Sequence, residues 1–222
     1  MAYINTVVFD LDGTLLNTLE DLADSVNAML VHYAYPQRHI DEIRRFIGTG
    51  VERLVELSIP DGLKNPNFDS CLKYFKDYYF KNMYNKTKPY DGIMFLLEEL
   101  RKRNCKMAIV SNKPDKAVKK LSLDYFANFF DVAIGESKHI RRKPAPDSIF
   151  TALNQLGSNI RESVYIGDSE IDVRAAKNAG ILCVGVTWGF RDRSLLADEG
   201  ADYIIDFPLE LLGLIDIWQN KK

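Results

Sequence analysis

Residue types that bind transition metals or form disulfides are scarce in this sequence of 222 residues, which has three cysteines and three histidines. Cys71, Cys105 and Cys183 lie far apart and form none of the closely spaced pairs typical of zinc or redox sites. The histidines also have no partner at ligand spacing. A chain of this length buries about 70% of the surface that its unfolded form exposes, so it can fold without a disulfide bond or a structural zinc ion. The sequence therefore excludes a disulfide-rich or zinc-stabilised protein and indicates buried thiols in a reducing compartment.

Long apolar runs and an excess of one charge are also missing. No stretch approaches the roughly 20 apolar residues that a membrane-spanning helix needs, and the amino terminus has no basic region followed by an apolar run. The 29 Lys and Arg residues and 31 Asp and Glu residues give a net charge of −2, which provides no general attraction for nucleic acid or anionic lipid. We therefore expect a cytoplasmic protein that binds neither membranes nor nucleic acid.

Short apolar segments rich in valine and isoleucine recur along most of the chain, with helical periodicity between them. Each apolar segment is nearly continuous, as in strands buried on both faces of a parallel sheet. The predicted strands cover residues 4–9, 106–110, 132–134, 164–166 and 181–186. The predicted helices between them cover residues 92–103, 115–123, 146–156 and 171–179. This alternation predicts an α/β fold with a doubly wound parallel sheet.

One long segment after the first strand breaks the alternation. Residues 15–85 show helical periodicity only, with long helices predicted at 19–31 and 68–84. The sequence therefore predicts a core domain made of residues 1–14 and 86–222. A small helical cap domain made of residues 15–85 is inserted after the first strand of that core. We expect hinges near residues 15–18 and 82–88.

Polar side chains follow the predicted strands at the sheet edge where ligands bind in open parallel sheets. Asp10 and Asp12 follow the first strand, and the two-residue period of an extended chain sends both side chains the same way. Later strands are followed, in order, by Ser111 and Asn112, by a loop that contains Lys143, and by Asp168 and Asp172. Four clustered carboxylates would repel one another unless a cation bound between them. Oxygen ligands without His or Cys favour Mg²⁺, which a substrate phosphate commonly completes.

The segments VVFDLDGTLLNT, IVSN, KPAPDSIF and VYIGDSEID carry these residues, and together they resemble the four motifs of the haloacid dehalogenase superfamily. The resemblance covers almost the whole chain and is to the phosphatase branch with a helical cap inserted after the first strand. It implies a catalytic core, Mg²⁺ as cofactor and a small phosphomonoester as substrate, hydrolysed through an aspartyl-phosphate. Asp12 argues against a dehalogenase, because a halide leaves without a proton.

The resemblance also implies a role for each motif residue. Asp10 would be the nucleophile, and Asp12 would protonate the leaving oxygen and then activate water. Mg²⁺ would be held by Asp10, the main-chain carbonyl of Asp12 and Asp168, with Asp172 farther from the ion. The residues that would take the phosphoryl oxygens are Ser111, the amide of Asn112, and Lys143.

A glycine-rich turn in the cap, which includes Gly48, Thr49 and Gly50, opens a helix and offers main-chain N–H groups to an anion. An ordinary flexible turn would have the same sequence. The pattern is similar to the cap loop of phosphoglycolate phosphatases, in which case Arg53 or Arg45 could pair with the carboxylate of a small substrate. The leading substrate is therefore 2-phosphoglycolate.

Several alternatives remain open at this point. Within the same chemistry they are inorganic pyrophosphate, a sugar phosphate, a nucleotide, or a phosphomutase reaction. A phospho-acceptor signalling module also uses an aspartate in a doubly wound sheet, but the helical insertion and Asp12 argue against one. Both a monomer and a homodimer are compatible with the sequence.

Overall fold

The computed structural model describes residues 3–220, and its central feature is a six-stranded sheet in the order β5-β4-β1-β6-β7-β8. All neighbouring strands in it are parallel. The strands are β1 (Thr6–Phe9), β4 (Lys106–Pro114), β5 (Val132–Glu136), β6 (Ser163–Gly167), β7 (Leu182–Val186) and β8 (Tyr203–Ile205). Strand order reverses between β1 and β6, which confirms the predicted α/β fold with a doubly wound sheet.

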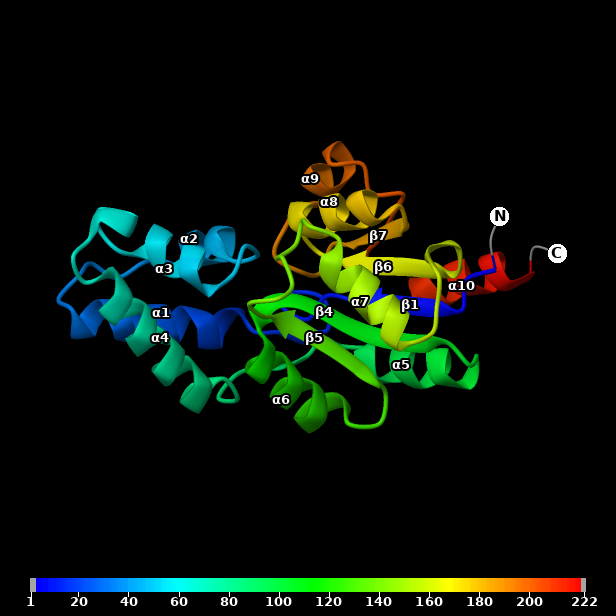
Figure 1. Ribbon diagram of the computed structural model, residues 1–222, viewed down its shortest axis with the longest axis horizontal. Helices are drawn as coiled ribbons and strands as arrows, with labels where there is room; N and C mark the ends of the chain where they lie inside the picture. The colour runs from blue at the N-terminus through cyan, green and yellow to red at the C-terminus, as the bar shows by residue number, and fades with distance from the viewer. Residues whose placement is uncertain (1–2, 221–222) are drawn as a thin grey trace.

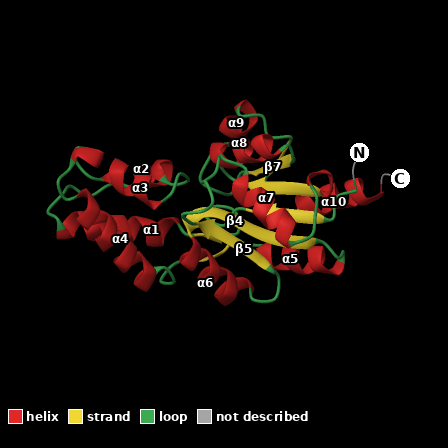
Figure 2. Cartoon of the chain, viewed as in Figure 1, coloured by secondary structure: helices red, strands yellow, loops and turns green. Residues whose placement is uncertain are grey.

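Helices cover both faces of this sheet (Figures 1 and 2). Alternate residues of β1 point to opposite faces of the sheet, and all are buried. Val7 and Phe9 belong to the apolar cluster on one face, and Val8 belongs to the cluster on the other. The first cluster includes residues of α5 (Ile93–Lys102), α6 (Asp115–Phe126) and α10 (Glu210–Asn220). The second includes residues of α7 (Asp147–Gln155), α8 (Glu170–Ala179) and α9 (Arg193–Asp198). Continuous apolar strands therefore form the middle layer of three.

The segment between β1 and α5 is helical and lies beyond the carboxyl end of the sheet (Figure 1). It contains α1 (Leu19–His32), α2 (Ile40–Phe46), α3 (Val51–Ser58), the short η1 (Gly62–Lys64) and α4 (Phe68–Asn82). The two long helices agree with the predicted segments, although the last one ends earlier than residue 84. We call α1 to α4 the cap helices; the division into domains at residues 15 and 85 stays a prediction.

Two short connections join the cap helices to the sheet. β2 (Leu16–Asn17) pairs antiparallel with β3 (Lys88–Pro89), and the buried Asp21 carboxylate accepts hydrogen bonds from the main-chain N–H groups of Lys86 and Thr87. These contacts lie within or beside the predicted hinges. Strands of two residues are too short to show a period, so the sequence did not predict them.

The sequence prediction was incomplete in the main sheet as well. β8 was missed because its three residues are not fully buried and show no clear pattern. β4 is longer than predicted and continues through Ser111 to Pro114, with a shift in its pairing to β5 after Val110. An additional helix, η2 (Ile160–Glu162), precedes β6. None of the described helices combines the length and apolar character that crossing a membrane requires.

Candidate active site

Asp10 stands at the carboxyl end of β1, beside the reversal of strand order. Its main-chain N–H donates to Ile166 O over 2.9 Å and so continues the pairing of β1 with β6. The buried carboxylate lies 2.8 Å from Lys143 Nζ through Oδ1. The sheet edge therefore holds an acidic side chain against a fixed cation.

A tight turn after Asp10 brings the chain against Asp168. Gly13 has a φ of 83°, and a Cβ atom at this position would lie 2.3 Å from Asp168 Oδ2. The next residue, Thr14, donates from Oγ1 to Asp168 Oδ1 over 3.2 Å. Asp168 thus occupies space that is open only because residue 13 is glycine.

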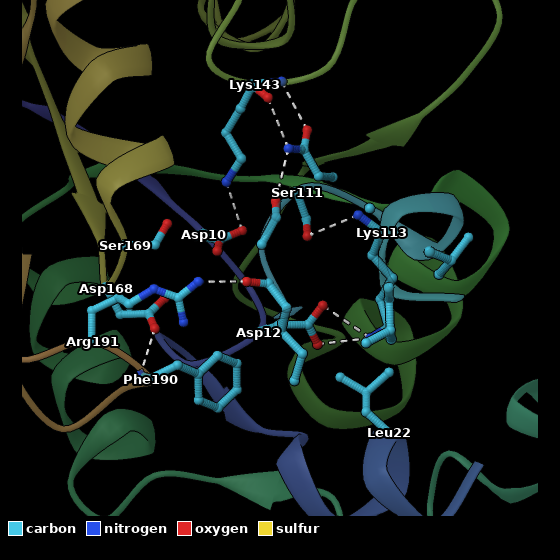
Figure 3. A pocket seen from close by; sticks show the side chains of 16 residues that line it. Asp10, Asp12, Leu22, Ser111, Lys113, Lys143, Asp168, Ser169, Phe190 and Arg191 are labelled. Carbon is cyan, nitrogen blue, oxygen red and sulfur yellow. Dashed lines mark hydrogen bonds and ion pairs between the residues drawn. The ribbon is translucent and has the colours of Figure 1, made fainter. Parts of the chain in front are cut away.

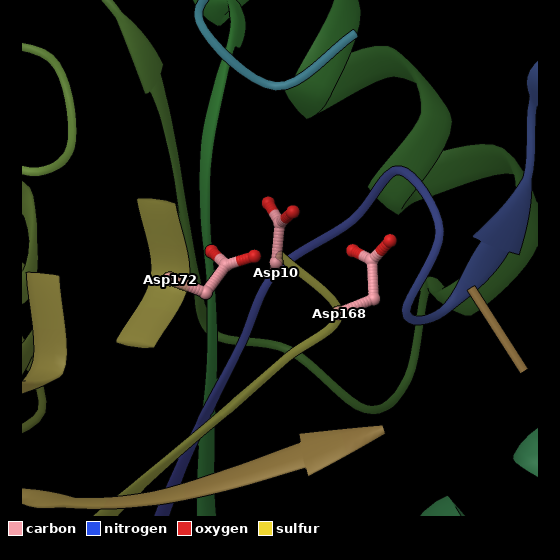
Figure 4. A group of neighbouring side chains, drawn as sticks. All are labelled: Asp10, Asp168 and Asp172. Carbon is pink, nitrogen blue, oxygen red and sulfur yellow. The ribbon is translucent and has the colours of Figure 1, made fainter. Parts of the chain in front are cut away.

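Asp172 is placed by the first turn of α8. The main-chain N–H and the hydroxyl of Ser169 donate to Asp172 Oδ2 over 3.1 and 2.6 Å, and Asp172 N donates back to Ser169 Oγ over 3.4 Å. This reciprocal cap fixes both the helix start and the carboxylate. Figure 4 shows Asp10, Asp168 and Asp172 projecting toward a common space from β1, the turn after β6, and α8.

The three carboxylates fit a divalent cation. Oxygen atoms of Asp10, Asp168 and Asp172 lie within 4.8 Å of one another, and all three residues are buried. Burial raises the pKa of Asp10 to about 7 against the lowering effect of Lys143, and the charge of Asp172 raises it further. Burial and the charges of Asp172 and Asp10 raise the pKa of Asp168 well above its usual range. One ammonium does not balance three carboxylates, and an all-oxygen set suits Mg²⁺.

Lys143 is the cation within this cluster. Besides its contact with Asp10, Nζ donates to Asp172 Oδ1 over 2.7 Å and to the hydroxyl of Tyr165 over 2.8 Å. Burial lowers the pKa of this ammonium, but the charges of Asp10 and Asp172 outweigh burial and raise it above its usual value. Lys143 is therefore charged and has acceptors for all three of its N–H groups.

Asn112 positions the main chain of Lys143. Asn112 Oδ1 accepts from Lys143 N over 2.8 Å, and Nδ2 donates to the carbonyls of Lys143 and Gly48, each over 3.0 Å. The side-chain amide that the sequence suggested for phosphoryl binding is thus used within the protein. Ser111 lines the same cavity as Asp10 and Lys143, and its hydroxyl accepts from Lys113 N over 3.3 Å.

Asp12 lies apart from the three clustered carboxylates and is paired with Lys113. Lys113 Nζ donates to Asp12 Oδ1 over 2.7 Å and to Oδ2 over 3.0 Å. The lysine side chain is 2% exposed and that of Asp12 13% exposed. Lys113 was not among the predicted site residues. It could have been found if the strand had been continued past Ser111, because residues 111 and 113 of an extended chain face the same way.

Of the five predicted cap residues, which include Arg45, two line the cavity in the described part of the chain. Gly48 and Gly50, with φ values of 126° and 98°, line the cavity above Asp10. Among the described residues, Thr49 and Arg53 do not line it. Arg53 lies on α3, 2.6 Å from Glu56 and 49% exposed.

Arg191, which follows β7 and was also missed, holds the cap turn against the core. Its guanidinium donates to three main-chain carbonyls at and just after the end of α2, and Nε donates to Glu170 over 2.9 Å. The neighbouring Phe190 lines the cavity, and its main-chain N–H donates to Asp168 Oδ2 over 2.7 Å.

The enclosed space between core and cap is small. A cavity of about 40 Å³ lies among these groups (Figure 3). Its polar wall comes from the sheet edge, and its cap side is apolar and includes Leu22, Ile47, Val51 and Leu54. Such a site combines a buried ammonium, a carboxylate held against it, a second carboxylate across the cavity and a carboxylate cluster that fits a cation, an arrangement suited to phosphoryl transfer.

Comparison with known proteins agrees with this geometry. A family model described as haloacid dehalogenase-like hydrolase matches residues 7–186. The chain belongs to this family. The predicted resemblance is confirmed.

A phosphoglycolate phosphatase of Pseudomonas putida is 34% identical over 207 residues, which cover 90% of this chain and 75% of the relative. A phosphoglycolate phosphatase of Aquifex aeolicus is 29% identical, with 96% and 97% covered. A crystal structure of a Lactobacillus delbrueckii protein superposes with a TM-score of 0.91 and 35% identity, covering 97% of this chain and 99% of that one. The predicted enzyme class is thereby confirmed: the chain is a phosphomonoester hydrolase of this family.

Proposed function

We propose that this phosphatase is Mg²⁺-dependent and hydrolyses a small phosphomonoester through an aspartyl-phosphate on Asp10, with 2-phosphoglycolate as the leading substrate. The observation that carries the proposal is the placement of Asp10. Its carboxylate faces the cavity, is held by Lys143 and stands beside a cluster of two further carboxylates. The relatives named as phosphoglycolate phosphatases support the choice of substrate.

Asp10 attacks phosphorus, and Asp12 gives a proton to the departing ester oxygen. Asp12 then takes a proton from the water that attacks the aspartyl-phosphate, which releases phosphate and restores Asp10. Lys143 and Ser111 face the transferring group and stabilise its oxygens. These steps need Asp10 and Asp12 in one cavity, which both residues line.

Asp10, Asp168 and the main-chain carbonyl of Asp12 would hold the metal ion. A bound Mg²⁺ supplies positive charge that neutralises the phosphoryl oxygens and orients them for in-line attack. Both oxygens of Asp172 already accept hydrogen bonds, from Lys143 and Tyr165 and from Ser169. We therefore assign Asp172 to holding Lys143 and to contacting the ion through water.

The size of the cavity favours small leaving groups over the alternatives. A cavity of about 40 Å³ roofed by Leu22, Ile47 and Leu54 favours a small substrate over a nucleotide while the cap rests on the core as it does here. A phosphomutase would also have to hold a second phosphate within that space. Asp12 beside Asp10 argues against a signalling module, which must preserve its phospho-form.

The test is phosphate release from a panel of 2-phosphoglycolate, pyrophosphate, sugar phosphates, nucleotides and an aryl phosphate in Mg²⁺. We expect 2-phosphoglycolate to give the highest kcat/KM. Asp10→Asn should lower turnover by about 1,000-fold or more while the far-UV circular dichroism spectrum is unchanged. Retention of a tenth of the activity in this variant would refute the assignment of the nucleophile.

A further inference from the structure

A buried ammonium stands on the leaving-group side of the cavity. Lys113 Nζ contacts both oxygens of Asp12, the carboxylate that protonates the departing oxygen. Three N–H groups belong to this ammonium, and Asp12 is its one carboxylate partner in the described chain. Lys113 therefore has capacity for a second anion beside Asp12.

The other cations near the site are already committed. Lys143 has three acceptors, and Arg191 donates to Glu170 and to three main-chain carbonyls. Arg53, which the sequence suggested for a substrate carboxylate, pairs with Glu56 away from the cavity. A carboxylate on the leaving group would thus find its charge partner in Lys113.

A cap residue lies next to Lys113. Lys113 Nζ lies 4.7 Å from the centre of the Tyr79 ring on α4, and Tyr79 borders the groove beside the cavity. The Tyr79 hydroxyl is buried close to Lys113, and within residues 3–220 it makes no hydrogen bond of good geometry. Burial, and to a smaller extent the charge of Asp12, raise the pKa of Tyr79 above its usual value, so the hydroxyl keeps its proton. A buried hydroxyl without a partner is costly unless a ligand satisfies it.

We propose that Lys113 Nζ and the Tyr79 hydroxyl form a subsite that binds the carboxylate of the leaving group. The inference rests on the proposed function, since it assigns residues to one end of its substrate. In 2-phosphoglycolate a single methylene separates the ester oxygen from the carboxylate. A carboxylate on Lys113 therefore places the ester oxygen next to Asp12, which must protonate it.

This subsite makes negative charge on the leaving group the basis of selection. The side chains on the cap side of the cavity are apolar, so besides the main-chain N–H groups of the turn at Gly48 and Gly50 a desolvated carboxylate has Lys113 as its partner there. Because Lys113 comes from the core and Tyr79 from the cap, the carboxylate is bound fully only when the cap lies on the core. Substrate binding and cap closure thus depend on the same contact.

The experiment compares kcat/KM for 2-phosphoglycolate with kcat/KM for ethyl phosphate, which has the same two-carbon ester without the carboxylate. The ratio of the two constants removes any general effect of Lys113 on Asp12, because both esters need the same proton. We expect Lys113→Met to lower this ratio by about 30-fold or more, and Tyr79→Phe by about 5-fold. Lys113→Arg should retain more of the ratio than Lys113→Met.

Lys116→Met and Tyr78→Phe are matched controls: Lys116 lies on α6 shortly after the end of β4, Tyr78 lies next to Tyr79 on α4, and neither lines the cavity. Both controls should keep the wild-type ratio. If Lys113→Met turns over too slowly to measure, the binding constant for 2-phosphoglycolate in an Asp10→Asn background, with and without Lys113→Met, provides the same comparison. Circular dichroism checks the fold of every variant.

The outcomes separate the subsite from the proposed function. A wild-type preference for 2-phosphoglycolate that Lys113→Met abolishes supports the subsite. A preference that survives Lys113→Met overturns the subsite and leaves the function standing. A wild-type enzyme that hydrolyses both esters equally well overturns the substrate and the subsite together, while the phosphatase chemistry remains.

Discussion

Arg191 Nη2 donates a hydrogen bond to the main-chain carbonyl of Ile47 over 2.7 Å and so joins the loop after β7 to the cap turn before Gly48. The guanidinium also donates to the carbonyls of Arg44 and Arg45, in the last turn of α2. Such terminal carbonyls lack partners within their helix. Glu170 holds the other side of the guanidinium and belongs to the first turn of α8, next to Asp168 and Asp172. One side chain therefore connects the cap with the segment that carries Asp168 and Asp172.

Replacing Arg191 with Lys should weaken the contact between cap and core. A lysine ammonium lacks the planar fork that reaches several acceptors at once. Loss of one or two hydrogen bonds should raise KM by about 10-fold with a smaller change in kcat. Steady-state kinetics in Mg²⁺ measures both constants. Arg53→Lys is the matched control and should change kcat/KM by less than about 2-fold, because its ion pair with Glu56 is exposed. An equal loss in the two variants would contradict the role of Arg191.

The stability of the metal-free protein should depend on Asp10 in a defined pH window. The pKa of Asp10 rises from 3.8 to about 7 in the folded protein, so the native state binds more protons than the unfolded chain between these values. The free energy of unfolding therefore falls as pH rises through the window, by up to about 1.4 kcal/mol per pH unit for one proton. The destabilisation is absent below about pH 4 and complete above about pH 7.

Asp10→Asn removes this dependence. In a chelating buffer the variant should be more stable than wild type at about pH 8 and should lose that advantage at about pH 5, as measured by urea unfolding. Saturating Mg²⁺ should reduce the advantage at high pH, because the cation compensates the buried carboxylates. A stabilisation that does not change with pH would count against a raised pKa for Asp10.

Substitution of Gly13 should damage metal binding as well as stability. Gly13→Ala places a Cβ atom against Asp168 and also strains a residue of positive φ. Together these effects should lower the free energy of unfolding by about 3 kcal/mol. Gly180→Ala is the matched control: its φ is 72°, but nothing lies within 4 Å of the added Cβ. Gly180→Ala should lower the free energy of unfolding by about 1 kcal/mol and should retain activity. Thermal unfolding and Mg²⁺ titration of both variants test the difference, and equal Mg²⁺ affinity in the two would refute the packing argument.

Removal of divalent metal should stop hydrolysis, and Mg²⁺ should restore it. Ca²⁺ should restore little activity, because its larger and more flexible coordination sphere disturbs in-line geometry. Asp168→Asn should raise the Mg²⁺ concentration needed for half-maximal activity by about 10-fold or more. Phosphate release over a metal titration gives these values. High turnover with Ca²⁺ would mean that the metal site has been described wrongly.

The linear order of strands and motifs made the acidic edge of the sheet predictable. In a parallel sheet the carboxyl ends of all strands lie together, so Asp10, Asp168 and Asp172 converge once the strands are recognised. The expected cluster of four was wrong in one member, because Asp12 pairs with Lys113 instead. Even the need for a cation followed, since clustered carboxylates repel. The cap residues were harder to place: Gly48 and Gly50 line the cavity, whereas Arg53 faces Glu56, because the direction of a helix face depends on what packs beneath it.

The α/β fold, the inserted helices and the polar residues at the strand ends could be predicted from the sequence, because periodicity and strand ends are local properties of the chain. The partners of Lys113, Tyr79 and Arg191 became visible only in the folded protein. Lys113 lies 101 residues from Asp12 along the chain, and Arg191 lies 144 residues from Ile47. These contacts form between segments that are far apart in the sequence, and no local pattern records which distant group a lysine, tyrosine or arginine will meet when the segments pack together.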